Sequence, residues 1–272
     1  MDEDERKRRG ASFGAVAAAY DEHRPEYPEA AVRWCLAPAL AAGADVAGLR
    51  VLDLGAGTGK LTGVLARLGA EVTAVEPDSE MLTELRRRLP GIRSLPGSAE
   101  AIPLPDGSVD AVLCGQAMHW FDLNVALPEI ARVLAGGGVL GALWNSDDDR
   151  VEWVAGLQAA VHGAARRSLS MQRAMMADFG VRFRPDLFGP LERAEFEHGQ
   201  RRTAPSLVAT IATHSQLLVM PPAERERLLT QATTYLATRP ETSGGEFTLP
   251  IVTSAVRAAR LGTGGSPGPS RM

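Results

Sequence analysis

The stretch Val51-Leu52-Asp53-Leu54-Gly55-Ala56-Gly57-Thr58-Gly59 decides the fold. Residues 49–54 read as a short apolar strand, and residues 59–68 read as a helix. Glycine permits a tight backbone turn and lets a ligand lie against the main chain, because it has no Cβ. In open α/β sheets, ligands bind beyond the carboxyl ends of the strands. The glycine turn therefore predicts a ligand site at the end of a buried strand.

The spacing of these glycines separates this turn from two common phosphate-binding loops. The glycines at 55, 57 and 59 give G-x-G-x-G, whereas the dinucleotide fingerprint is G-x-G-x-x-G. Gly55 and Lys60 lie one residue too close together for a P-loop. The spacing disfavours an oxidoreductase that uses NAD(P), although that class stays open as an alternative.

Apolar runs alternate with helical patterns around this turn. Strands are expected at 71–76, 92–95, 109–114 and 139–144, the last after the turn Gly136-Gly137-Gly138. Helices are expected at 13–20, 29–43, 77–88 and 123–134. This alternation predicts an α/β fold with a mostly parallel, doubly wound sheet covered by helices on both faces. After residue 150 the pattern predicts helices at 150–166, 168–179, 205–218 and 222–237, and strands at 191–202 and 246–256.

Composition excludes several classes of protein. The chain has 272 residues, two cysteines and five histidines, with no His pair at metal-ligand spacing, so we expect no metal site. Its formal net charge of −4 argues against nucleic-acid binding. No run of 18 apolar residues is present, and the charged N-terminal residues have no apolar core of a secretion signal. We therefore expect a cytoplasmic protein without a membrane span.

The sequence resembles the class I S-adenosylmethionine (SAM)-dependent methyltransferases. Residues 51–59 resemble motif I of that family, and further elements follow in the family's order. Glu76 ends the second strand, Gly97-Ser98-Ala99-Glu100 follows the third, and residues 104–110 (LPDGSVD) resemble the family's LPFPDxSFDxV run. The segment Phe13…Tyr20-Asp21-Glu22-His23-Arg24-Pro25-Glu26-Tyr27-Pro28 is similar to one found in the trans-aconitate and ubiquinone/menaquinone methyltransferases. The resemblance implies a Rossmann-like sheet of seven strands.

The resemblance also implies a set of cofactor-binding residues. Glu76 would accept both ribose hydroxyls, and Asp53 would orient the glycine loop or reach the methionine amino group. The loop at 98–100 would lie beside the adenine, and Gln116 would line the methionine and sulfonium end. The expected cofactor-binding residues are Tyr20, Arg24, Asp53, Gly55, Ala56, Gly57, Gly59, Glu76, Pro77, Ser98, Ala99, Glu100 and Gln116.

His119, in the run Gln116-Ala117-Met118-His119-Trp120-Phe121, is the candidate catalytic residue. Histidine suits proton transfer at neutral pH, which an acceptor with a hydroxyl or an enolisable carbon requires. A preformed carboxylate needs no base, and His119 would then only shape the pocket wall. Both roles stay open from the sequence.

We expect one methyltransferase domain over 11–261, between a disordered head at 1–10 and a disordered tail at 262–272. Within it we expect lid helices at 11–43, a cofactor-binding core at 49–145, a helical cap insert at 150–190, and C-terminal sheet and substrate-side helices at 191–261. The expected partner is a small-molecule acceptor such as a carboxylate or a natural-product intermediate, methylated on O, C or N by a monomer or homodimer. A SAM-binding protein with a cyclase-like or regulatory role remains the alternative.

Overall fold

The computed structural model describes residues 25–41, 44–161, 173, 183–212, 217 and 220–262. The head at 1–10, the helix expected at 13–20 and nearly all of the tail lie outside the described residues. Most of the helix expected at 168–179 also lies outside them.

The core is a single seven-stranded sheet in the order β3-β2-β1-β4-β5-β7-β6. Strands β1 to β5 are parallel, while β7 runs antiparallel to β5 and β6 runs antiparallel to β7. The predicted α/β sheet is therefore confirmed. The strands are β1 (Arg50–Leu54), β2 (Glu71–Glu76), β3 (Arg93–Pro96), β4 (Val109–Gly115), β5 (Leu134–Asp147), β6 (Glu192–Thr203) and β7 (Glu246–Ala259).

Helices cover both faces of this sheet. One face packs in a core with α3 and α4, and the other face packs in a second core with α6. Helix α5 lies over β2 and β3, with Leu85 packed against Ala74 of β2. These helices are α3 (Glu29–Leu36), α4 (Lys60–Arg67), α5 (Ser79–Arg88) and α6 (Leu123–Val133). The helix expected over 29–43 ends at Leu36, and a 3₁₀ turn at Ala37–Ala39 follows.

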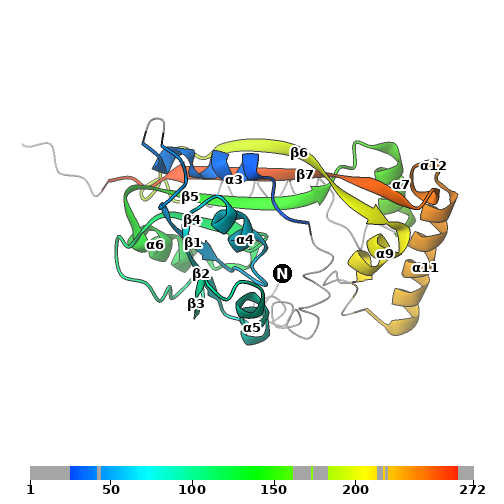
Figure 1. The fold of residues 1–272 in the computed structure, drawn as a ribbon, viewed down its shortest axis with the longest axis horizontal. Coiled ribbons are helices and arrows are strands. Elements are labelled where there is room, and N and C mark those ends of the chain that lie inside the picture. Colours follow the sequence, from blue (N-terminus) through cyan, green and yellow to red (C-terminus); the bar gives the residue numbers. More distant parts are fainter. Residues whose placement is uncertain are drawn as a thin grey trace, which may run out of the picture.

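The long strands β5, β6 and β7 continue past the core to a group of helices at one end, as Figure 1 shows. This group has its own apolar core, in which Trp153 packs edge-on against Phe247 at a ring distance of 5.6 Å. The helices are α7 (Glu152–Ala160), α9 (Ala204–Ala212), α11 (Pro222–Thr238) and α12 (Pro240–Ser243). No helix in the described ranges is long and apolar enough to span a membrane.

Strand β5 differs from its predicted bounds because the three glycines lie inside the strand. It begins at Leu134, and Gly137 has a φ of +77°. A Cβ on Gly138 would lie 2.8 Å from the carbonyl oxygen of Asp110. The absent side chain therefore lets β5 pass close to β4, where the pairing register shifts between Val109 and Ala111.

Candidate active site

The glycine loop lies at the carboxyl end of β1, where the strand order changes direction between β1 and β4. The N–H groups of Gly55 and Ala56 donate to the carbonyl oxygen of Val75, at 2.9 and 3.1 Å, and so tie the loop to β2. A Cβ on Gly55 would lie 2.7 Å from the Ala117 Cβ, which explains the glycine there. Gly57 has a φ of +57°, and its missing Cβ would meet nothing within 4 Å. The loop is therefore open at Gly57.

Glu76 is buried at the carboxyl end of β2 and joins two backbone segments. Its Oε2 accepts a hydrogen bond from the N–H of Gly57 at 2.8 Å, and its Oε1 accepts one from the N–H of Asp78 at 2.9 Å. Burial raises the pKa of Glu76, and these two N–H groups only partly offset that rise. A carboxylate offers about four acceptor positions, so two remain for a ligand with hydroxyl groups.

Asp53 is fully buried within β1. Its Oδ2 accepts a 2.6 Å hydrogen bond from the hydroxyl of Thr62 in α4. Its Oδ1 has no hydrogen-bond partner within the described part of the chain. Burial is the main cause that raises the pKa of Asp53 to about 7; the charge of Glu76 contributes to the rise, and the Thr62 hydrogen bond opposes it. A buried acceptor without a partner is costly, so this oxygen fits a ligand that brings a positively charged donor.

The loop after β3 contains Ser98, Ala99 and Glu100. Ala99 is buried, and an isolated bridge pairs Ser98 with Ala101. Glu100 Oε1 accepts a hydrogen bond from the N–H of Asp122 at 2.9 Å, which ties this loop to the start of α6. The N–H of Gly97 reaches the carbonyl oxygen of Glu76 at 3.4 Å. The loop at 98–100, which the sequence predicts to lie beside the adenine, is therefore next to the end of β2.

Gln116 follows β4 in a left-handed conformation, with a φ of 56°. Such a conformation is unusual for a residue other than glycine, and surrounding contacts must hold it. Its N–H donates to the carbonyl oxygen of Leu143 at 2.8 Å, and its Nε2 donates to that of Asn145 at 2.8 Å. His119 follows in the 3₁₀ turn Met118–Trp120, where its ring lies 4.7 Å from that of Trp120.

The predicted residues that the structure describes thus gather at one edge of the sheet. Asp53 lies in β1, Glu76 ends β2 and Gln116 directly follows β4. The glycine loop connects to Glu76 through the Gly57 N–H. Pro77 is exposed in the turn between β2 and α5. Tyr20 and Arg24, predicted for the N-terminal segment, lie outside the described residues.

Sequence reasoning missed a polar chain that crosses β5, β7 and β6. The Nδ2 of Asn145 donates to the carbonyl oxygens of Pro25 and Glu26, at 3.3 and 3.1 Å. Its Oδ1 accepts a 2.5 Å hydrogen bond from the Thr253 hydroxyl, which also lies 2.9 Å from His198 Nε2. Since that hydroxyl gives its one proton to Asn145, it accepts from a protonated Nε2 of His198. The available signal was a polar residue, Asn145, at the end of an apolar strand.

Tyr27 is a second residue that the sequence did not single out for the site. It is buried, and a Cβ on Gly115 would lie 2.7 Å from its hydroxyl oxygen. Glycine at 115 therefore makes room for the tyrosine beside Gln116. This contact places the chain that enters α3 against the carboxyl end of β4.

Comparison with known proteins agrees with this geometry. A family model described as a methyltransferase domain matches residues 52–142. An uncharacterised methyltransferase of Mycobacterium tuberculosis is 40% identical over 251 residues, which cover 91% of this chain and 95% of that protein. An uncharacterised methyltransferase-like protein of Schizosaccharomyces pombe is 34% identical over 80% of this chain and 82% of its own length.

A solved structure supports the same assignment. The structure named "a Putative Type II Methyltransferase from Anaeromyxobacter dehalogenans" superposes with a TM-score of 0.64 at 26% identity, covering 88% of this chain and 99% of that one. Together with the parallel sheet, the glycine loop and the acidic residue that ends β2, these relatives show that the chain belongs to the class I SAM-dependent methyltransferase family.

Proposed function

We propose that this protein transfers a methyl group from SAM to an oxygen, carbon or nitrogen atom of a small-molecule acceptor and releases S-adenosylhomocysteine. The observation that carries the proposal is the Glu76 carboxylate, which is held by the Gly57 N–H at the open side of the glycine loop. A dinucleotide-binding loop instead needs free N–H groups at a helix N-terminus for its phosphates. Glu76 suits ribose hydroxyls, although NAD sites also place an acidic residue at the end of this strand. The distinction from a diphosphate site rests on the Gly57 N–H, which Glu76 already occupies, and on the G-x-G-x-G spacing, which departs from the dinucleotide fingerprint.

In this proposal each part of SAM has a partner in the chain. The unpartnered Oδ1 of Asp53 supplies an acceptor for the methionine amino group, directly or through a water molecule. Gly55, Ala56, Gly57 and Gly59 form the surface against which the cofactor lies, and Glu76 with the adjacent Pro77 lies toward the ribose. Ser98, Ala99 and Glu100 lie toward the adenine, and Gln116 toward the sulfonium. Tyr20 and Arg24 complete the set in the proposal.

The bound cofactor supplies an activated methyl group on a sulfonium leaving group. The task of the protein is to hold an acceptor atom in line with that group at near-attack distance. Gln116 is fixed by two hydrogen bonds at the end of β4, so it forms a rigid wall for that alignment. For acceptors that lose a proton, we propose His119 as the general base. For a carboxylate acceptor, His119 shapes the wall and no base is required.

The acceptor enters, in this proposal, between the N-terminal segment and the helices after residue 150. The proposed acceptor is a carboxylate or a natural-product intermediate. The net charge of −4 argues against nucleic-acid substrates. We also propose that 49–145 forms the cofactor-binding core of one domain, with the surrounding segments on the acceptor side.

Transfer of an isotopically labelled methyl group tests the proposed reaction. The protein is incubated with methyl-labelled SAM and a mixture of small carboxylates, phenols and amines, and labelled products are separated from SAM. We expect label in at least one acceptor, with an equal amount of S-adenosylhomocysteine. Binding of SAM with no transfer to any acceptor class would favour the cyclase-like or regulatory alternative.

A further inference from the structure

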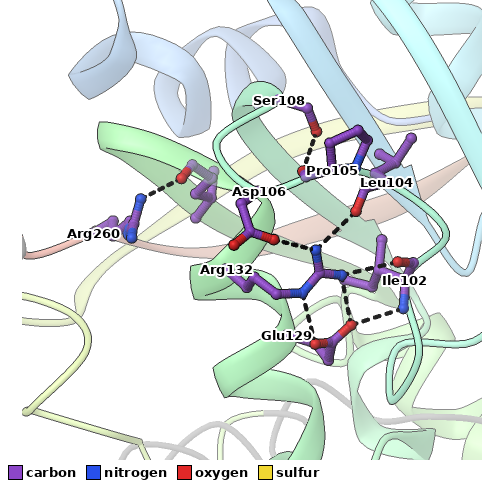
Figure 2. A network of polar contacts seen from close by, with 9 residues as sticks. Ile102, Leu104, Pro105, Asp106, Ser108, Glu129, Arg132 and Arg260 are labelled. Atoms are coloured by element: carbon purple, nitrogen blue, oxygen red, sulfur yellow. Dashed lines mark hydrogen bonds and ion pairs between the residues drawn. The ribbon is translucent and has the colours of Figure 1, made fainter.

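The side chain of Arg132, in α6, uses every one of its hydrogen-bond donors. Two donors form a bidentate pair with the Glu129 carboxylate, each at 2.8 Å. The others reach the carbonyl oxygens of Ile102 and Leu104, at 3.0 and 2.8 Å, and Oδ1 of Asp106 at 2.8 Å. Figure 2 shows the guanidinium at the centre of this network, between α6 and the segment that leads into β4.

The backbone of α6 holds the same segment. The N–H of Gly107 donates to the carbonyl oxygen of Arg132 at 2.9 Å. The N–H of Ile102 donates to Oε2 of Glu129 at 3.1 Å, so the carboxylate that pairs with Arg132 also binds the segment directly. Residues 102–107 are therefore fixed to α6 from both ends.

This segment continues directly from the loop that contains Ser98, Ala99 and Glu100. That loop has its own tie to α6, through Glu100 and the N–H of Asp122. The tie at Asp122 holds the loop at its far end from β3, and the Arg132 network holds the chain immediately after it. Loss of either tie would leave residues 98–100 to be ordered when a ligand binds, which weakens binding.

We propose that Arg132 is a positioning residue that sets the affinity for the adenosine half of the cofactor by fixing the 98–100 loop against α6. The proposal rests on the proposed function, because it assigns that loop to the adenine. Arg132 itself touches no part of the proposed site. Its planar fork reaches acceptors in five directions, which a lysine ammonium cannot reproduce.

The chain offers a matched control in the pair between Arg50 and Asp110. Arg50 also binds a carboxylate through two nitrogens, at 3.0 and 2.5 Å, and its side chain is also partly exposed. This pair joins the start of β1 to the start of β4, at the amino-terminal edge of the sheet. It therefore lies at the opposite edge from the proposed site and has no contact with the 98–100 loop.

Calorimetric titration of Arg132→Gln, Arg132→Lys and Arg50→Gln tests the proposal. The two ligands are S-adenosylhomocysteine and 5′-methylthioadenosine, which lacks the amino-acid part, and a melting temperature is recorded for each variant. We expect Arg132→Gln to lower the affinity for both ligands by the same factor, roughly tenfold, because the cost of ordering the loop is added to binding. Arg132→Lys should weaken both in the same way, and it carries the test if the glutamine variant does not fold. Arg50→Gln should leave both affinities within about twofold of the wild type, even where its melting temperature falls equally.

Asp53→Asn supplies the converse pattern. It should weaken S-adenosylhomocysteine and leave 5′-methylthioadenosine unchanged, since the second ligand has no amino group for the Asp53 carboxylate. If the Arg132 variants bind both ligands as tightly as Arg50→Gln does, the positioning role is overturned while the proposed function stays intact. Failure of the wild type to bind either ligand would overturn the proposed function, and the positioning role with it.

Discussion

Replacing Asp53 with asparagine removes a buried charge while keeping the shape of the side chain. Burial raises the pKa of this carboxyl from 3.8 to about 7 in the folded protein. The folded pKa lies above the unfolded one, so the contribution of this carboxyl to stability is fully present below about pH 4 and is lost as the pH rises through about 7. Each pH unit over that window corresponds to about 1.4 kcal/mol, which gives a total loss of about 4 kcal/mol.

Urea unfolding followed by tryptophan fluorescence at several pH values measures this loss. Between pH 5 and pH 8 the free energy of unfolding of the wild type should fall by about 3 kcal/mol relative to Asp53→Asn. The asparagine amide can still accept from the Thr62 hydroxyl, and any cost of its unpaired N–H₂ group does not depend on pH. The free energy of unfolding of the variant minus that of the wild type should therefore rise by about 3 kcal/mol between pH 5 and pH 8.

Asp110→Asn is the matched control for this experiment. Its partner Arg50 lowers the pKa of Asp110, so this carboxyl is ionised in both states above about pH 5 and adds no slope there. Parallel pH profiles for the wild type and Asp53→Asn would refute the reasoning, because they would show that Asp53 ionises in the folded protein as it does in water.

Three further substitutions test the site. Glu76→Gln should lower the affinity for S-adenosylhomocysteine by roughly 10- to 100-fold, because charge-assisted hydrogen bonds contribute about 1.5–3 kcal/mol. An unchanged dissociation constant in calorimetry would exclude Glu76 from the ribose site. His119→Ala should lower kcat by about 100-fold or more with a proton-bearing acceptor; a change under fivefold in steady-state kinetics would assign His119 to the pocket wall. Asn145→Ala leaves the carbonyl oxygens of Pro25 and Glu26 without their amide donor, so urea unfolding should show a loss of about 2 kcal/mol; an unchanged free energy would show that the amide does not anchor this segment.

The elements around the candidate site could be predicted because their signals are local. The run from Val51 to Gly59 contains both the strand and the turn that follows it, and the end of β2 at Glu76 is marked by β-branched residues followed by Pro77. The order of strands and helices then determined the parallel sheet. Each of these predictions used residues that are neighbours in the chain.

The polar contacts that hold the site together could not be predicted in this way. Thr253 and Asn145 are 108 residues apart, and they meet only because β7 pairs with β5 in one particular register. The donors of Arg132 reach residues 26 to 30 positions earlier in the chain, through a loop with no regular pattern. The start of β5 was also predicted too late, because Gly137 and Gly138 resemble a turn although they lie inside a strand.

Calorimetric titration of the purified protein with SAM, S-adenosylhomocysteine and NADH tests the central claim most directly. The G-x-G-x-G spacing, with the Gly57 N–H already bound to Glu76, predicts no binding of NADH. The unpartnered Oδ1 of Asp53 predicts binding of both sulfur-containing ligands. Loss of that binding in Glu76→Gln would tie it to this site. Binding of NADH alone would contradict the account, because the glycine loop would then hold a diphosphate, and every cofactor contact assigned from it would be wrong.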